Sequence, residues 1–183
     1  MTNLNTKRLL LIPADPALAE SVAAYYLRNR DFLRIYEPQR EEEFFTAAYQ
    51  AQLLASDAQM AAEQRGYRFY IAPQSQPQLI IGSIALNNIV WGVFKSCHLS
   101  YKLDKDFLNI GLMTEAVAAI EEFAFKQLQL HRIEANVMPR NAPSMRVLQK
   151  CGYENEGFSK KYLCINGVWE DHIHMVKLNE EIE

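Results

Sequence analysis

The hydrophobic pattern of the first third of the chain predicts one strand followed by two helical regions. Residues 8–13 (RLLLIP) form a short apolar run that is typical of a strand. Residues 15–28 begin with an acidic residue and a proline, which favours the start of a helix. Residues 40–64 are rich in Glu, Ala, Gln and Leu, so they predict a second long helical region that Gly66 is suited to end.

The middle of the chain changes to a strand pattern. Residues 67–73 (YRFYIAP), 78–89 (QLIIGSIALNNI) and 96–103 (SCHLSYKL) are β-branched or aromatic runs separated by Pro, Ser, Gln and Asn. This spacing favours an antiparallel meander. The strongest helical period follows, because a single apolar stripe runs through Leu112, Ala116, Val117, Ile120, Phe123, Ala124 and Leu128.

The last third predicts a strand, a short helix and a closing pair of strands. The strand covers residues 131–139, and the short helix covers 143–151 and stops at a glycine. Residues 153–165 and 168–178 then form two strands around an Asn-Gly turn. The predicted order is therefore one strand, helices, three strands, a helix, a strand, a helix and two strands.

Composition indicates one domain and excludes several classes of protein. The 183 residues are 49% hydrophobic and show no repeat or linker, so we expect a single domain over residues 1–183. Nineteen basic and 22 acidic residues give a net charge of -3, so the chain has no overall positive charge that would attract nucleic acid. No run approaches the roughly 20 apolar residues that span a bilayer, and the first residues lack a leader pattern, so we expect a soluble, cytoplasmic protein.

Cysteine and histidine positions do not predict a metal site or a disulfide framework. Cys97, Cys151 and Cys164 are an odd number without metal-type spacing, and we expect reduced thiols that are mostly packed. His172 and His174 alternate onto one strand face, but they lack the further ligand that a closed metal site needs. We therefore expect no metal and interpret both histidines as surface residues of a strand.

Two segments carry candidate chemistry. Residues 106–116 (DFLNIGLMTEA) lead from a strand into the strongest helix, whose first N–H groups can hold a phosphate. Asn109 and Gly111 are the residue types that most readily adopt a positive φ in such a turn. In the second segment, Asn141 and Ser144 lie around the start of a short helix, where they could be capping residues or site residues.

Together these segments resemble the GNAT superfamily of acyl-CoA-dependent N-acetyltransferases, in particular its RimJ/RimL-type protein N-terminal acetyltransferases. The resemblance lies in residues 104–116 and 131–178, which include "LMTEA", "MPRN", "GYENEGF" and "YLCINGVWEDHIHMVKL". In the family pattern of Gln or Arg, two residues, Gly, one residue, Gly or Ala, this chain has Asp106, Asn109 and Gly111. A carboxylate would repel phosphates, so we expect the Asp106 side chain to turn to solvent or to cap a nearby N–H.

The resemblance implies an α+β (α/β) fold with a mixed, mostly antiparallel seven-stranded sheet flanked by helices. Its fourth and fifth strands, here SCHLSYKL and HRIEANVM, would splay apart at one end to admit the pantetheine arm of acetyl-CoA. The residues that the resemblance assigns to acetyl-CoA binding are Tyr101, Lys102, Leu103, Asn109, Ile110, Gly111, Leu112, Met113, Asn141 and Ser144.

The implied reaction is direct acetyl transfer to a primary amine. A backbone N–H around residues 101–103 would polarise the thioester carbonyl. Many members use a tyrosine as the acid at the position where this chain has Leu148, so the resemblance assigns Ser144 as hydrogen-bond donor to the sulfur and Asn141 as its orienting partner. Residues 29–38 (NRDFLRIYEP) are similar to the aromatic-acidic loop that lines the substrate entrance in this family, so the resemblance assigns Tyr36 and Glu37 to acceptor binding.

Several alternatives remain open at this level. The general base could be Glu37, Tyr36, His98 or Glu134, and Tyr162 is a further candidate for the site lining. The acceptor is most plausibly a protein N-terminus, as in the ribosomal-protein type, but a polyamine, an amino acid or a drug would also carry a primary amine. A non-catalytic acyl-CoA-binding module is the alternative outside the enzyme class. We expect a monomer or homodimer with no direct contact to nucleic acid.

Overall fold

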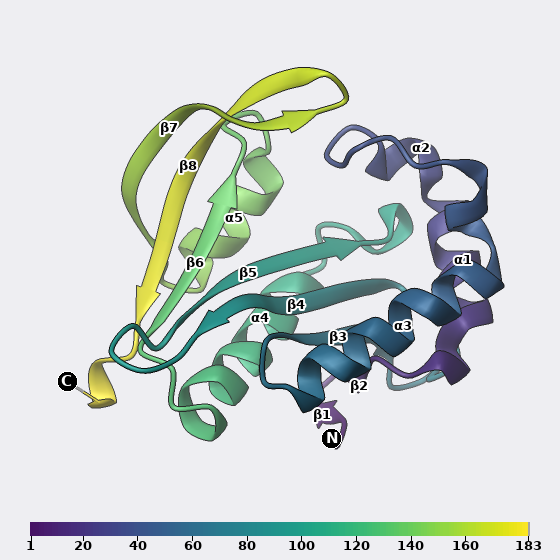
Figure 1. The fold of residues 1–183 in the computed structure, drawn as a ribbon, viewed down its shortest axis with the longest axis horizontal. Helices are drawn as coiled ribbons and strands as arrows, with labels where there is room; N and C mark the ends of the chain where they lie inside the picture. Colours follow the sequence, from purple (N-terminus) through teal and green to yellow (C-terminus); the bar gives the residue numbers. More distant parts are fainter. Residues whose placement is uncertain (183) are drawn as a thin grey trace.

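The fold is built on one open sheet, which the computed structural model describes together with its helices over residues 1–182 (Figure 1). The sheet has eight strands in the order β1-β2-β3-β4-β5-β6-β8-β7. All neighbouring strands pair antiparallel except β5 and β6, which are parallel. The strands are β1 (Leu4–Asn5), β2 (Leu9–Pro13), β3 (Tyr67–Pro73), β4 (Gly82–Val90), β5 (Ser96–Leu103), β6 (Arg132–Val137), β7 (Glu154–Ile165) and β8 (Val168–Leu178).

The predicted mixed, mostly antiparallel sheet is confirmed, but the number of seven strands was wrong. The additional strand is β1, a two-residue segment that pairs with β2. Two residues are too few to show a period of two in the sequence, so only the pairing partner reveals this strand. The remaining strands match the predicted order.

Helices cover both faces of the sheet and create two separate cores. The larger core packs α4 (Leu112–Glu122) and α5 (Ala142–Lys150) against one face. The smaller core packs α1 (Ala19–Arg28), α2 (Arg30–Leu33) and α3 (Ala47–Ala62) on the other side. The apolar stripe of the strongest predicted helix is buried in the larger core, and a π-helical turn extends α4 at its end.

The second helical region begins later than its composition predicts. Glu42–Phe45 form a 3-10 turn, and α3 starts only after Thr46. The Thr46 side chain accepts a hydrogen bond from the Tyr49 N–H, which caps the helix. Among residues 1–182, no helix is both long enough and apolar enough to cross a bilayer.

The strands β5 and β6 part after a short paired stretch, as predicted. Their register runs only from Ser96 opposite Arg132 to His98 opposite Glu134. Beyond that point β5 continues to Leu103 and β6 continues to Val137. Because each strand keeps an antiparallel partner on its outer side, the separation leaves a wedge in the middle of the sheet.

A buried carboxylate ties the end of β5 to α1. Asp104 has no exposed surface, and its carboxylate accepts hydrogen bonds from Arg28 Nε at 2.6 Å and from Asn29 Nδ2 at 2.9 Å. The same carboxylate accepts from the Asp106 N–H at 3.0 Å, and Asn29 Oδ1 accepts from the Lys105 N–H at 3.0 Å. These contacts fix the backbone that leads from β5 towards α4.

Gly82 allows β4 and β5 to approach closely beside the wedge. A Cβ atom at this position would lie 2.5 Å from the Lys102 carbonyl oxygen, which belongs to the backbone of β5. We expect Gly82→Ala to displace β5 and to cost about 1–3 kcal/mol of folding free energy, measured by thermal unfolding. Gly157→Ala in β7 is the matched control, because its Cβ would meet no atom closer than 4.0 Å. Equal melting temperatures for both variants would contradict this expectation.

Candidate active site

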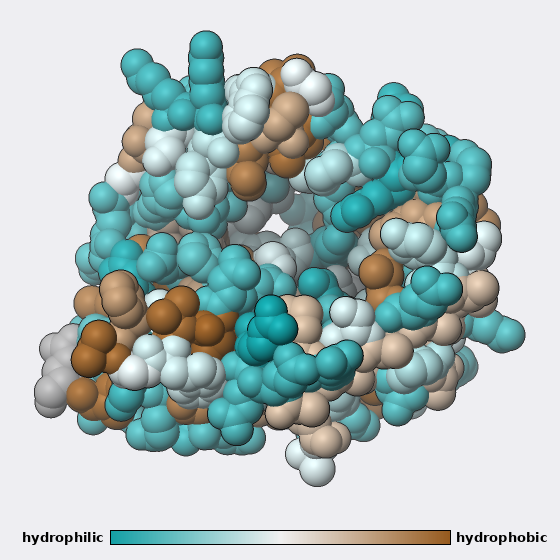
Figure 2. All heavy atoms as spheres, viewed as in Figure 1, coloured by the Kyte–Doolittle hydropathy of each residue, from teal (hydrophilic) through white to brown (hydrophobic). Residues whose placement is uncertain are grey.

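A cavity of about 590 Å³ fills the wedge between β5 and β6. Figure 2 shows the corresponding hollow at the centre of the molecular face. The lining comes mainly from α2 and the loop after it, β5, the start of α4, β6, α5 and the β7–β8 hairpin. The site therefore draws on segments from both ends of the chain.

Strand alternation divides the β5 wall of the cavity between two faces. Leu99, Tyr101 and Leu103 belong to the core that contains α4 and α5. Lys102 points to the opposite face, where its Nζ lies 2.5 Å from Glu37 Oε1 and 5.2 Å from the ring centroid of Tyr26. Because successive side chains of a strand alternate, β5 presents one set of groups to each side of the sheet.

The turn before α4 has the backbone geometry of an anion site. Asn109 and Gly111 have φ values of 61° and 80°, so both adopt the positive φ that the sequence suggested. Leu112 and Met113 then begin α4 and line the cavity, where the first N–H groups of the helix lack intrahelical partners. Arg146 and Lys150, one turn apart on α5, line the same cavity. This combination fits the phosphates of a coenzyme A ligand.

Asp106 does not belong to this lining. Its side chain is exposed, while its N–H is bonded to Asp104. The geometry matches the expectation that this carboxylate turns to solvent. Ile110, which the resemblance assigned to coenzyme binding, is also outside the lining, because its side chain is 56% exposed and its carbonyl accepts from Arg8 Nη1 at 2.8 Å. The assignment of Ile110 to coenzyme binding stays a prediction, and it would have to rest on the backbone of this residue.

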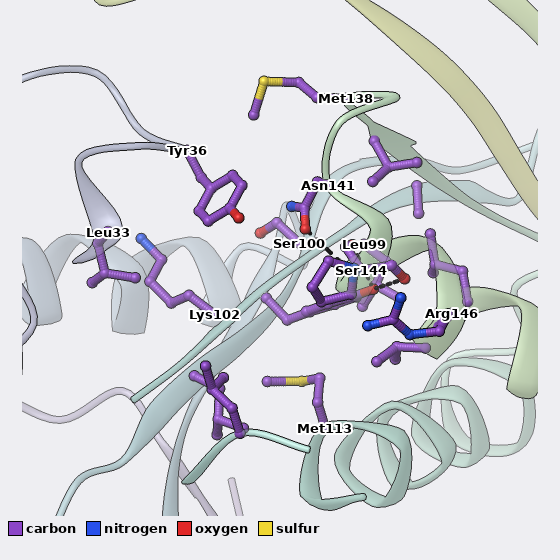
Figure 3. A pocket seen from close by; sticks show the side chains of 18 of the residues that line it. Leu33, Tyr36, Leu99, Ser100, Lys102, Met113, Met138, Asn141, Ser144 and Arg146 are labelled. Atoms are coloured by element: carbon purple, nitrogen blue, oxygen red, sulfur yellow. Dashed lines mark hydrogen bonds between the residues drawn. The ribbon is translucent and has the colours of Figure 1, made fainter. Parts of the chain in front are cut away.

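Asn141 and Ser144 meet at the start of α5 and contact a residue that sequence analysis had assigned another role. Asn141 Oδ1 accepts from the Ser144 N–H at 3.3 Å, so Asn141 caps the helix. Ser144 Oγ lies 2.9 Å from the hydroxyl of Tyr101, which also bonds to the Ser144 carbonyl (Figure 3). Burial raises the pKa of Tyr101, which keeps this phenol protonated. Tyr101 of β5 thus lies beside Ser144. Leu148, at the position where many members of the family have a tyrosine as the acid, is buried in the core.

Tyr36 and Glu37, from the loop after α2, also line the cavity. Figure 3 shows the Tyr36 ring in the cavity between Lys102 and Asn141. Glu37 is engaged by Lys102 at 2.5 Å and by Arg40 Nη2 at 3.8 Å. Its carboxylate is therefore a paired anion.

A set of polar contacts joins the loop after α2 to the β7–β8 hairpin, which approach each other in Figure 1. Arg140 Nη2 donates to the Ile35 carbonyl at 3.2 Å and to Glu170 Oε1 at 2.7 Å. Asn166 Nδ2 donates to the Arg34 carbonyl at 2.8 Å. We refer to these three contacts as the Arg140 bridge.

Two of the proposed bases lie outside the cavity. His98 and Glu134 face each other at 3.7 Å on the paired part of β5 and β6, and Glu134 also bonds to Arg132 at 2.8 Å. Neither contributes to the lining. Tyr162 is likewise outside it, although its hydroxyl accepts from Asn136 Nδ2 at 3.3 Å and Asn136 does line the cavity.

His172 is a lining residue that the sequence interpretation missed. It is 4% exposed and contributes to the cavity wall, so it is not the surface residue that the strand pattern suggested. Its position on β8 could be found only by knowing that β8 lies next to β6 in the sheet. The alternation of His172 with His174 was the available signal, and it indicates a shared face but not which face.

Neither the two more buried thiols nor the metal-ligating side chains give a competing site within residues 1–182. No three His, Cys, Asp or Glu side chains in this range gather closely enough to hold a metal ion. Burial raises the pKa of Cys97 to about 12 and that of Cys151 to about 11, so neither is a thiolate near neutral pH.

The splayed strands, the turn before α4 and the Asn141–Ser144 pair define a class of enzyme. Residues 8–154 match the family model "Acetyltransferase (GNAT) domain". The chain belongs to this family and is an N-acetyltransferase of the GNAT type.

Individual relatives cover almost the entire chain. It is 37% identical to the probable N-acetyltransferase YjcK of Bacillus subtilis, over 98% of this chain and 99% of the relative. It is 35% identical to the ribosomal protein uS5-alanine N-acetyltransferase of Escherichia coli, over 93% of this chain and 87% of that protein. The crystal structure of a ribosomal-protein-S5-alanine acetyltransferase from Vibrio fischeri superimposes with a TM-score of 0.94 at 33% identity, covering all of both chains.

Proposed function

We propose that this chain transfers the acetyl group of acetyl-CoA to the α-amino group of a protein N-terminus, as in the ribosomal-protein type. The observation that carries the proposal is the two-sided cavity, with phosphate-compatible groups on the α4–α5 side and Tyr36, Glu37 and Lys102 on the other. The likeness to the uS5-alanine enzymes supports the choice of acceptor. With a ribosomal protein as acceptor, the enzyme would act in the cytoplasm.

The α4–α5 side would hold the donor. The N–H groups at the start of α4 would face the pyrophosphate, and Arg146 and Lys150 would add positive charge. Backbone N–H groups of β5 around residues 101–103 would polarise the carbonyl beside the wedge. Acetyl-CoA supplies the acetyl group as a thioester.

The Tyr101–Ser144 pair would stabilise the departing sulfur. Ser144 Oγ would donate a hydrogen bond to the thiolate, while the Tyr101 hydroxyl at 2.9 Å would donate to Ser144 or pass on its proton through it. Asn141 would hold the start of α5, and thereby Ser144, in place. Tyr101 would thus add a second hydroxyl to the hydrogen-bond chain that ends at the sulfur.

The opposite side would receive the amine. A protein α-amino group has a pKa of about 7.7–8.0, against about 10.4 for lysine, so roughly a tenth of it is unprotonated at pH 7, against well below about 0.1% of a lysine side chain. Glu37 and the Tyr36 hydroxyl would position the amine, and Lys102 would hold Glu37 in place. The acceptor and the donor would thus approach the wedge from opposite faces of the sheet.

The proposal is tested by release of free coenzyme A thiol in the presence of different amines. Short peptides with a free N-terminus, Ala first among them, are expected to support turnover, and the same peptides with a blocked N-terminus are the matched control. Turnover with polyamines, free amino acids or amine drugs but with no peptide would assign a small-amine acceptor instead. Acetyl-CoA binding without turnover of any amine would favour a binding module. The oligomeric state, a monomer or a homodimer, stays a prediction that light scattering can test.

A further inference from the structure

We infer that His172 is the general base that takes the proton from the acceptor amine. This inference rests on the proposed function, because it assigns a role within the same site. It is carried by the side-chain geometry of His172, by its place in the cavity wall and by the pairing of the other candidate bases.

The hydrogen bond at Nδ1 leaves the other ring nitrogen of His172 with its lone pair. Nδ1 lies 3.1 Å from the Glu170 carbonyl oxygen. A carbonyl can only accept, so the neutral ring carries its proton on Nδ1. Nε2 is then the atom that can accept a proton.

The sheet register places His172 on the acceptor side of the cavity. On β8, Ile173 and His174 stand opposite Val137 and Asn136 of β6, so His172 comes next to Met138. Alternation puts His172 on the same face as His174 and Asn136. Val137 on the other face is buried in the core with α5, which is the donor side. Met138 marks this end of the cavity in Figure 3.

Of the described residues that line the cavity, only Glu37 and His172 have side chains that normally gain a proton between pH 4 and 8. Both carboxylate oxygens of Glu37 already have cationic partners, Oε1 with Lys102 at 2.5 Å and Oε2 with Arg40 at 3.8 Å. His174 uses both ring nitrogens, with Nε2 at 2.7 Å from Ser159 Oγ and Nδ1 at 2.5 Å from Asn136 Oδ1. His172 is therefore the better placed proton acceptor.

Neighbouring groups hold the ring and define its electrostatic surroundings. Tyr162 of β7 packs against it with ring centroids 5.4 Å apart, and Tyr162 also packs against His174. On β8 itself, Glu170 is paired with Arg140 of the Arg140 bridge. Glu37, Arg40 and Lys102 are the charged groups that line the cavity from the α2 loop and β5. The ring is thus fixed by aromatic packing and by its bond to a backbone carbonyl.

The proposed step balances as a proton transfer coupled to acyl transfer. The nitrogen lone pair of the amine bonds to the carbonyl carbon, and the C–S bond breaks with its electron pair going to sulfur. The proton that the nitrogen loses goes to Nε2 of His172, and sulfur gains a proton from the Ser144–Tyr101 pair. Exchange with solvent then returns both sites to their starting state.

The test compares His172→Gln and His172→Ala with the wild type. We expect kcat/KM for a reactive peptide to fall by about 100-fold or more, with acetyl-CoA affinity unchanged. The deficit should shrink as the pH rises above 8, because hydroxide then competes with the missing base for the proton that the nitrogen loses during acyl transfer. Added imidazole should partly restore His172→Ala. His131→Gln, next to the start of β6 and outside the cavity lining, is the matched control and should keep full activity.

A deficit that is independent of pH and insensitive to imidazole would overturn the inference and leave His172 a packing role. So would a His172→Gln variant with full turnover. Nitrogen NMR of the wild type gives a measurement that depends on no variant, because a proton on Nε2 in the neutral ring would contradict the assignment. A wild type that binds acetyl-CoA but acetylates no amine would overturn the proposed function together with this inference, whereas active His172 variants would overturn the inference alone.

Discussion

Replacing Ser144 with Ala is expected to lower kcat for acetyl transfer by about 100-fold, and Tyr101→Phe is expected to have an effect of similar order. Each change breaks the hydroxyl pair at 2.9 Å that faces the cavity from α5 and β5. The KM for acetyl-CoA should change little, because the α4 turn and the α5 cations remain in place. Steady-state kinetics of thiol release measures both parameters.

The two substitutions should not be additive if the hydroxyls act as one unit. The double variant Tyr101→Phe with Ser144→Ala is then expected to be little worse than either single variant. Tyr49→Phe on α3 and Ser96→Ala at the start of β5 are matched controls, since neither residue lines the cavity. Full turnover in both single variants would remove the pair from the mechanism, and multiplied effects would show that the hydroxyls act separately.

Replacing Asp104 with Ala is expected to cost about 3 kcal/mol of folding free energy, equivalent to roughly 10 °C in melting temperature for a domain of this size. The substitution leaves Arg28 and the buried Asn29 without their shared acceptor. Asp106→Ala, two residues further along, removes an exposed carboxylate and should change stability by less than about 0.5 kcal/mol. Thermal unfolding measures the stability of both variants. Equal losses of folding free energy in the two would contradict this assignment.

The same carboxylate predicts how that loss depends on pH. Burial alone would raise the pKa of Asp104, but hydrogen bonds from Asn29, from the Asp106 N–H and from Arg28 outweigh it, so the pKa is lowered. A lowered folded-state pKa stabilises the fold fully above the unfolded value of about 3.9 and loses this effect as the pH falls through the folded value. The difference in stability between wild type and Asp104→Ala should therefore narrow in strong acid and be constant near neutrality.

Local sequence signals predicted most of the secondary structure. The apolar stripe of α4 and the meander of β3 to β5 follow from periods that the residues themselves display. The start of α3 was missed because helical composition extends across residues 40–46, whereas the actual start depends on the Thr46 cap. The strand β1 was missed because its evidence is a partner strand rather than a pattern.

The site was predictable where it depends on contiguous residues and unpredictable where it depends on strand neighbours. The turn at Asn109 and Gly111 and the Asn141–Ser144 cap are local, and both have the expected backbone form. The contact between Tyr101 and Ser144 joins positions 43 residues apart. His172 reaches the cavity because β8 lies between β6 and β7, an order that no local pattern contains.

The Arg140 bridge joins the loop after α2 to the β7–β8 hairpin, two segments that also contribute residues to the cavity lining. Under the proposed function, an acceptor has to reach the cavity past these joined segments, and a free chain end can do so more readily than a loop that is fixed at both ends. If the acceptor is a ribosomal protein, we expect its acetylation while its N-terminal residues are still free, before they become enclosed in an assembled particle.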